Sequence, residues 1–265
     1  MFRRCLLPVF FAVMVVPHSF LLLLSLGSGW SFPALLPDRL DAAPWRDLLA
    51  LSGLWQAAVC GLQLSFLCGL LSAASGLLLS RTIRRLPLWL RRSGRAAILF
   101  PFVISPAVAA VCLFDLAART GAVGTFTGVL LCQLVFGTAA AAVILQEGWS
   151  DAAERQEQLV RMLGGGTGDV WTHVVWPHSR GLLGICFLQT ALFSWLDYGI
   201  VLHLGGGRVT TLTVRLFTLI REASMNHAAL AALLLLMPAV LFVLLLMGRG
   251  SGEMVRARVV VEQRR

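Results

Sequence analysis

The chain has 265 residues, of which 58% are hydrophobic and 13% are charged, and its formal net charge is +9. Soluble domains carry about 25% charged residues, and disordered segments combine low hydrophobicity with high charge, so this composition excludes both classes. It predicts that residues 1–265 form a single polytopic membrane domain.

The basic residues exclude one class of function. All 22 are Arg, and none is Lys. A P-loop ATPase needs a Lys that reaches the terminal phosphates of its nucleotide, so we expect this chain to bind no ATP and to hold no cofactor of its own. Because the Arg residues flank apolar segments, their charge indicates membrane orientation, and we expect no nucleic-acid partner.

Six segments are apolar over about the 20 residues that a helix needs to cross a bilayer. They are residues 5–26, 53–80, 96–117, 125–146, 181–203 and 228–247. The first follows two Arg residues, as a secretory signal would, but its apolar part is longer than a signal core and no cleavage motif follows it. We therefore expect a retained first helix and an all-α membrane protein with six transmembrane helices.

The Arg residues are distributed unequally between the two sides that six spans define. Sixteen lie before the first span, in 81–95, in 147–180 or after the last span, whereas six lie in 27–52, at Arg119 and in 204–227. The positive-inside rule places the Arg-rich side, with both termini, in the cytoplasm. Residues 147–180, here called the 147–180 loop, then form the longest cytoplasmic connection.

The second span carries small residues at helical spacing, which let helices approach closely in a membrane. They form two neighbouring rows, which are Gly61, Ser65, Gly69 and Ala73, and Cys68, Ser72 and Gly76. Packing inside one bundle and packing against another subunit would give the same pattern.

The 147–180 loop is predicted to contain a short surface helix and a glycine turn. Asp151 and Glu154 have the spacing of a capping box, and the glycines from Gly164 end the helix. Pro177 predicts a break before the fifth span. An apolar stripe follows the helical period and consists of Ala152, Leu159, Val160, Met162 and Leu163. Such a helix can lie on lipid or dock on a protein, and its partly acidic polar face favours a protein.

This loop resembles the EAA loop of ABC importer permeases. The motif runs Glu-Ala-Ala, three residues, Gly, nine residues, an aliphatic residue, one residue, Leu and Pro, and Gly164, Val174 and Pro177 have the matching spacing. The sequence departs from the motif at the Glu-Ala-Ala positions, which hold Gln158, Leu159 and Val160. Glu157 lies one residue early, and Glu154 lies one turn early.

Two further segments are similar to the same family. The third span contains Pro106 in the sequence Ile-Ser-Pro-Ala-Val, like a core helix of these permeases. Residues 204–219 are similar to an outer glycine loop and the segment after it in permeases for iron, thiamine and polyamines.

The resemblance implies a type I ABC importer permease bundle in the bacterial inner membrane. The chain would then be no enzyme but half of a translocation pathway, paired with a second identical or related permease chain. A cytoplasmic ATPase dimer on separate chains would contact the loop through Glu154, Glu157, Gln158, Leu159, Val160, Gly164, Val174 and Pro177. A periplasmic or extracellular solute-binding protein would deliver the solute, for which the similar permeases suggest thiamine, a polyamine or ferric iron.

Asp197 is the candidate pathway residue, because an acid within a membrane span is costly and usually faces a cavity or a partner. Gln189, Thr190 and Ser194 lie on neighbouring turns of the same predicted helix and could form one polar stripe with it. An acid close to the outer interface, hydrated or capping a helix, would explain Asp197 equally well.

The His and Cys residues show no metal-ligand spacing, and no G-x-S-x-G motif is present. We therefore expect no metal site in this chain. A polytopic intramembrane enzyme and a membrane assembly factor are the alternative functions.

Overall fold

The computed structural model describes residues 2–28, 39–42, 45–46 and 52–241. The described chain is helical except for one antiparallel pair of short strands, β1 (Gly27–Ser28) and β2 (Arg39–Leu40). Two compact units make up the molecule, one from Met1–Gln56 with Arg215–Arg265 and one from Ala57–Val214.

The first unit contains α1 (Phe2–Leu26), the strand pair and a final helix described over Met225–Leu241. Hydrogen bonds join its parts: the Trp45 indole donates to Ser25 Oγ at 3.2 Å, the Asp41 amide donates to the Leu26 carbonyl at 2.7 Å, and the Asn226 amide donates to the Gly27 carbonyl. Residues 242–247 of the predicted sixth span, the Arg residues after it and much of the predicted 27–52 loop lie outside the described residues.

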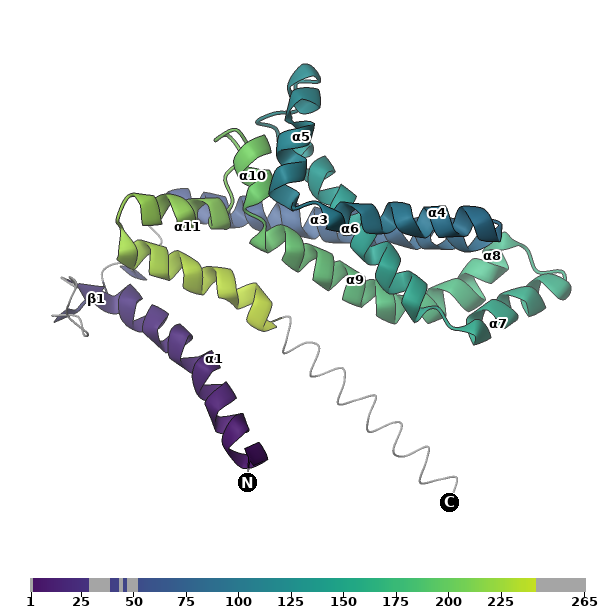
Figure 1. Cartoon of the computed structure of the whole chain (residues 1–265), viewed down its shortest axis with the longest axis horizontal. Helices are drawn as coiled ribbons and strands as arrows, with labels where there is room; N and C mark the ends of the chain where they lie inside the picture. The colour runs from purple at the N-terminus through teal and green to yellow at the C-terminus, as the bar shows by residue number, and fades with distance from the viewer. Residues whose placement is uncertain (1, 29–38, 43–44, 47–51, 242–265) are drawn as a thin grey trace. The chain divides into compact units, whose positions relative to one another are not determined.

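The second unit is a bundle of long and short helices (Figure 1). In chain order the helices that form it, or run into it from the first unit, are α3 (Ser52–Arg85), α4 (Leu88–Leu99), α5 (Pro106–Arg119), α6 (Phe126–Gly148), α7 (Asp151–Met162), α8 (Thr167–Val170), α9 (Trp176–Leu196), α10 (Gly199–Leu204) and α11 (Leu212–Arg221). A 3₁₀ turn (Phe100–Val103) follows α4, and a π-helical segment (Trp171–Val175) precedes α9. In Figure 1, α7 and α8 lie at one end of the α3–α6–α9 bundle, and α5 and α10 lie toward its other end.

The small residues of α3 pack against helices of the same chain. A Cβ added at Gly76 would lie 2.5 Å from the Ala141 Cβ on α6, and one at Gly69 would lie 2.9 Å from the Phe187 carbonyl oxygen on α9. Backbones approach this closely only where a side chain is missing. Of the two interpretations of these rows, packing inside one bundle is therefore the one that the structure supports.

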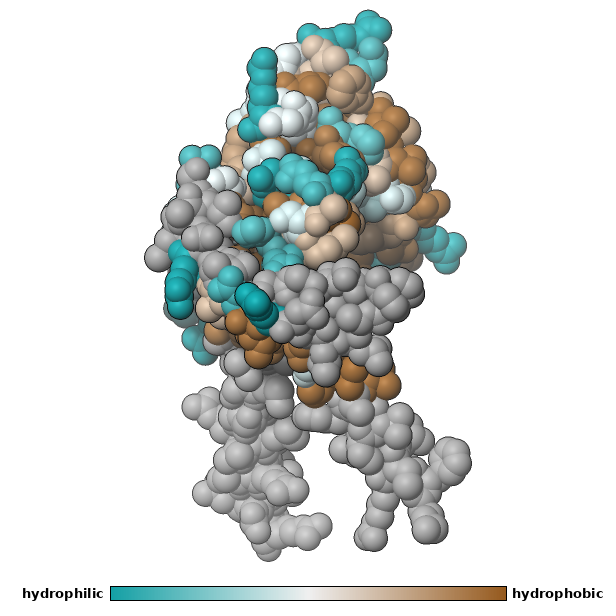
Figure 2. Space-filling view, turned by 90° about the vertical axis from the view of Figure 1, so that its left-hand side faces the viewer, coloured by the Kyte–Doolittle hydropathy of each residue, from teal (hydrophilic) through white to brown (hydrophobic). Residues whose placement is uncertain are grey.

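Two described helices are long and apolar enough to cross a membrane, Gly53–Arg85 and Phe126–Gly148. A third crossing is possible if α4 with its 3₁₀ turn and α5 form one span, although they meet at an angle of 99°. The chain is thus a membrane protein with several apolar helices, and Figure 2 shows brown hydrophobic residues interspersed with teal hydrophilic ones on one face. The number of six spans stays a prediction.

The predicted third span, 96–117, is wrong as one continuous helix. The break lies at Ser105, whose backbone is extended (φ −61°, ψ 140°), as expected for the residue before Pro106. The predicted inner turn 81–95 is also too long, because α3 continues to Arg85 and α4 begins at Leu88.

Candidate functional site

The 147–180 loop contains the predicted surface helix as α7, with a different cap. Ser150 is the N-cap: its backbone is extended, and its side chain accepts a hydrogen bond from the Ala153 amide at 3.3 Å. The capping box predicted from Asp151 and Glu154 is therefore wrong, because Asp151 is already helical. Ser is among the best residues for this position, so the helix start is still explained by the sequence.

Gly164 ends α7 in a Schellman motif, as its position after the last helical residues predicts. It has φ +85°, which a residue with a side chain rarely adopts. Its amide bonds the Arg161 carbonyl at 3.1 Å, and the Gly165 amide bonds the Val160 carbonyl at 2.9 Å. These two bonds satisfy carbonyls that the helix end would leave unpaired.

One face of α7 packs inward through Ala153, Glu157 and Val160. Ala153 is fully buried, and Val160 packs against a core cluster that includes Val170 and Val175. The Glu157 carboxylate accepts two hydrogen bonds from Arg81 Nη2, at 3.0 and 3.1 Å, although the two residues are 76 positions apart. The inward face of α7 is thus held on α3 by an ion pair as well as by apolar contact.

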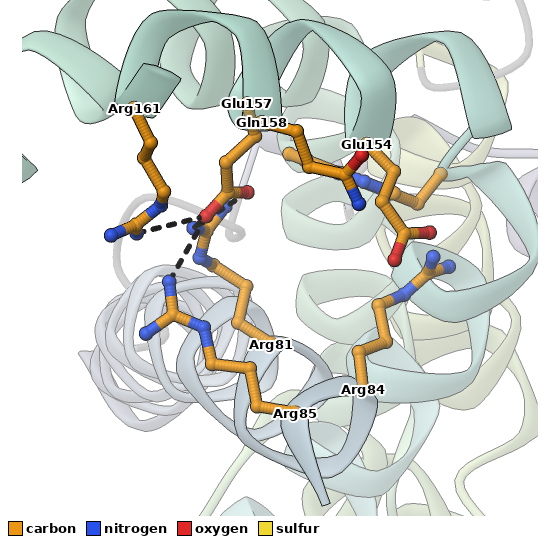
Figure 3. A pocket seen from close by; sticks show the side chains of 8 residues that line it. Arg81, Arg84, Arg85, Glu154, Glu157, Gln158 and Arg161 are labelled. Atoms are coloured by element: carbon orange, nitrogen blue, oxygen red, sulfur yellow. Dashed lines mark hydrogen bonds and ion pairs between the residues drawn. The ribbon is translucent and has the colours of Figure 1, made fainter. Parts of the chain in front are cut away.

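Three Arg side chains converge on Glu157 (Figure 3). Besides Arg81, Arg85 donates at 3.1 Å and Arg161 donates at 3.2 Å to the same carboxylate. Burial raises the pKa of Glu157, but the charges and hydrogen bonds of the three Arg residues outweigh it and leave the pKa below its ordinary value. Glu157 is therefore ionised at neutral pH.

Arg81 is itself fixed by two aromatic rings. Its guanidinium carbon lies 5.4 Å from the Trp149 ring centroid and 5.2 Å from the Trp171 ring centroid, distances at which a cation is attracted to the ring. The residue is 9% exposed. Arg81 thus connects α3, the end of α6, α7 and the π-helical segment, beside a cavity of about 180 Å³.

The outward face of α7 exposes apolar side chains near its C-terminus. Leu159 is 56% exposed, Met162 is 82% exposed and Leu163 is 79% exposed. We call these three residues the α7 apolar patch. The predicted single stripe is therefore wrong in part, because Val160 packs inward while the other three large apolar residues point away from the bundle. Gln158 and Glu154 are also exposed and line the cavity beside Arg84.

Pro177 does not break the chain's path into α9, contrary to the prediction. The helix runs on from α8 through the π-helical segment, in which the Trp176 amide bonds the Trp171 carbonyl five residues earlier. Proline clashes with the carbonyl four residues before it, and a π turn relieves this clash by shifting the hydrogen bonds. Val174, at the aliphatic position of the motif, is buried with 2% exposure.

The second candidate region lies at the break between α9 and α10. The Asp197 carboxylate accepts hydrogen bonds from Gln133 Nε2 at 3.1 Å, from the Ile200 amide at 3.4 Å and from the Val201 amide at 3.3 Å. Ser194 Oγ donates to Gln133 Oε1 at 2.7 Å. Asp197 therefore caps the first turn of α10, and Ser194 supports it through Gln133.

Asp197 also borders a cavity of about 500 Å³, which we call the helix-break cavity. Its lining comes from the break before α5 and from α9 with the break after it: Ser105, Pro106, Ala107, Gln189, Leu192, Phe193, Leu196, Asp197, Tyr198 and Gly199. The structure thus brings Gln189 and Asp197 to one cavity. Ser194 is buried away from it, and Thr190 bonds the Cys186 carbonyl of its own helix.

Sequence reasoning missed two residues that organise these regions. Arg81 was used only to assign the cytoplasmic side of the membrane, although an Arg at the end of an apolar span can reach back to a neighbouring loop. Gln133 was overlooked, although an amide in the middle of an apolar helix usually has a buried partner. Among the described residues, no group of three or more His, Cys, Asp or Glu side chains could hold a metal ion.

Comparisons with known proteins identify solved structures with a similar fold. No protein-family model and no curated protein matches the sequence. A crystal structure of a bacterial ABC transporter involved in the import of the acidic polysaccharide alginate matches with a TM-score of 0.68 and 15% identity, over 93% of this chain and 94% of that chain. The chain has the fold of an ABC transporter subunit. A crystal structure of an amino acid ABC transporter with histidines matches with a TM-score of 0.53 and 15% identity, over 76% of this chain and 96% of that chain.

Proposed function

We propose that the chain is the permease subunit of an ABC importer, and that α7 couples it to a cytoplasmic ATPase carried on separate chains. The observation that carries the proposal is a fold shared with a bacterial ABC importer along 93% of the chain. The chain itself then does no catalysis and binds no ATP.

The build of α7 supports the coupling role. A helix that transmits force must be attached firmly on one side and must offer a binding surface on the other. Glu157 and Val160 attach α7 to the bundle, while the α7 apolar patch is exposed at the end of the helix. Exposed apolar groups of this kind mark interaction sites when they gather in one place.

The Glu position of the motif holds Gln158 in this chain, and the geometry suggests which residues take over the role of that acid. Glu157 is occupied by Arg81, Arg85 and Arg161, so it is not the group offered to a partner. Glu154 and Gln158 are exposed on the same helix. We infer that the ATPase contacts the α7 apolar patch with Glu154 and Gln158 beside it, and that Glu157 fixes the helix from behind.

The remaining parts of the importer follow from this function. A permease with six spans is half of a two-fold pathway, so the working unit pairs two such chains in a bacterial inner membrane. A solute-binding protein outside the cell would deliver the solute to the end of the bundle that carries α5 and α10.

Co-purification tests the proposal. The chain is expressed together with candidate P-loop ATPase subunits from its own genome and purified in detergent, and ATP hydrolysis is measured after reconstitution into lipid vesicles. The proposal predicts a stable complex with one such ATPase, in which the chain changes the rate of ATP hydrolysis. A chain that purifies alone and alters ATP hydrolysis by none of these ATPases would contradict it.

A further inference from the structure

We propose that the helix-break cavity binds a small organic cation and that Asp197 supplies the charge that selects it. The inference rests on the proposed permease function, because it names the class of solute that such a permease would carry. Four features of the described residues lead to it: the meeting of two helix breaks, an uncompensated carboxylate, the size of the cavity and its apolar wall.

Two interrupted helices meet at this cavity. One break precedes Pro106 and the other follows Leu196, and residues of both line the same space. They are held together tightly, since a Cβ at Gly199 would lie 2.7 Å from the Ala107 Cβ. Irregular backbone at membrane depth is tolerated where it borders a polar cavity, and transporters commonly bind solutes at such discontinuous helices.

The Asp197 charge has no cationic partner among the residues that line this cavity. Its side chain is largely buried, and the groups that donate hydrogen bonds to it, the Gln133 amide and the backbone amides of Gly199, Ile200 and Val201, are all neutral. The ten lining residues include no Arg, Lys or His. A cation entering the cavity would compensate the buried charge and be favoured over an anion.

The cap role of Asp197 does not require this charge. Asn and Asp are equally good at accepting the first amides of a helix, and α10 has only six residues. A carboxylate is costly within a membrane span, where a neutral amide would cap as well. The charge itself therefore has a use beyond the cap.

The cavity suits an organic cation better than a bare metal ion. Its volume of about 500 Å³ falls in the range of about 300–1,000 Å³ that small-molecule sites occupy. Leu192, Phe193 and Leu196 give it an apolar wall, and Phe193 adds an aromatic ring that can contact an ammonium group. A protein site that holds a metal ion supplies several ligands, commonly more than one of them acidic, whereas Asp197 is the one acid among the residues that line this cavity.

Charge-selective labelling of one introduced thiol tests the inference. Gln189→Cys places the thiol in the cavity, in a background in which the exposed Cys112 is Ser. Two methanethiosulfonate reagents of similar size, one with a trimethylammonium group and one with a sulfonate, are applied separately. The rate at which each reagent labels the protein is divided by its rate with a free thiol in solution. Labelling of the parent protein, which lacks Gln189→Cys, is subtracted first.

The inference predicts that the cationic reagent reacts at least about fivefold faster, and that Asp197→Asn removes most of this preference. Asp115→Asn is the matched control, because it removes the charge of an exposed carboxylate that Arg119 pairs outside the cavity. Asp115→Asn should leave the ratio of the cationic to the anionic labelling rate unchanged. If Asp197→Asn does not change this ratio, or if the sulfonate reagent reacts faster, the inference is overturned.

A second measurement does not depend on the folding of the Asp197→Asn protein. Tetraethylammonium should slow the reaction of Gln189→Cys with neutral N-ethylmaleimide, whereas benzenesulfonate should not. Equal protection by both ions, or protection by the anion alone, contradicts the inference. Co-purification of the ATPase is measured on the same preparations. Cation-selective labelling without a stable ATPase complex would count against the permease function. A stable ATPase complex without cation-selective labelling would count against the cation site.

Discussion

Glu157 holds α7 on the bundle through Arg81 and Arg85 of α3, and it also pairs with Arg161 on α7 itself. Glu157→Gln removes the charge while keeping the shape, and it leaves Arg81 buried without its counter-ion, which is costly. We expect hydrogen exchange of the α7 amides to become about tenfold faster, measured by mass spectrometry. Glu154→Gln is the control on the same helix, because Glu154 is exposed, and it should change exchange little. Equal exchange in both variants would show that the ion pairs do not attach α7.

The same attachment should depend on pH. The pKa of Glu157 is below its ordinary value in the folded chain, because the three Arg stabilise the carboxylate more than burial destabilises it. Its stabilising contribution is therefore complete above the ordinary Glu pKa of about 4.3 and is lost as the pH falls through the lower folded value. Pepsin should cleave α7 slowly above about pH 4.3 and faster only as the pH falls well below the ordinary Glu pKa, whereas in Glu157→Gln cleavage should already be fast at the higher pH. Cleavage of both proteins with the same pH profile would contradict this role.

Gly164 sets the direction in which the chain leaves α7. A β-branched residue is strained at φ +85°, whereas Asn tolerates this region better. Gly164→Val should therefore disrupt ATPase association or the link between hydrolysis and uptake, and Gly164→Asn should do so less. Gly168→Val is the matched control, since Gly168 lies in the same loop with open space around it and no positive φ. Normal association and uptake in Gly164→Val would show that this turn is not part of coupling.

At the level of the helices, proline was the least predictable residue. Pro106 lies in the first turn of α5 after a 99° bend, whereas Pro177 is accommodated by a π turn inside a continuing helix. Both outcomes obey the same steric rules, because a proline tolerates a helix start or a shifted hydrogen-bond pattern. Which of the two occurs depends on the surrounding packing, and no local sequence pattern around the proline reveals it.

The close contact of α3 with α6 makes Gly76 a sensitive position. A side chain there would collide with the Ala141 Cβ and with the Ala142 amide nitrogen at 2.9 Å, so the two helices would have to move apart. We expect Gly76→Leu to lower the free energy of unfolding by about 1–3 kcal/mol and the Tm by several degrees in detergent. Gly53→Leu on the same helix should have little effect, because nothing lies within 4 Å of its added Cβ. Equal Tm values for the two variants would contradict this packing.

The sequence predicted local features of the candidate sites better than their long-range partners. The end of α7 at Gly164 and the buried Val174 follow from local chemistry and spacing. The pairing of Arg81 with Glu157 joins residues 76 positions apart, and no local pattern encodes it. Likewise the helix-break cavity forms only because the breaks at Ser105 and Asp197 come together in the folded bundle.

For the whole molecule, the proposed function predicts a pair of chains. Crosslinking in membranes, with the ATPase present, should trap dimers of this chain or of this chain with a related permease. Trapping of monomers alone under these conditions would contradict the pairing, whatever the fold of the single chain.

The central claim is that α7 docks an ATPase through its exposed apolar patch, and photo-crosslinking in the membrane tests it most directly. Met162, which is 82% exposed, is replaced by a benzophenone amino acid, and the crosslinked partner is identified by mass spectrometry. The same replacement at Arg119, at the end of α5, is the control. The account predicts that Met162 captures a P-loop ATPase and that Arg119 does not. Absence of that ATPase at Met162, or equal capture at Arg119, would contradict it.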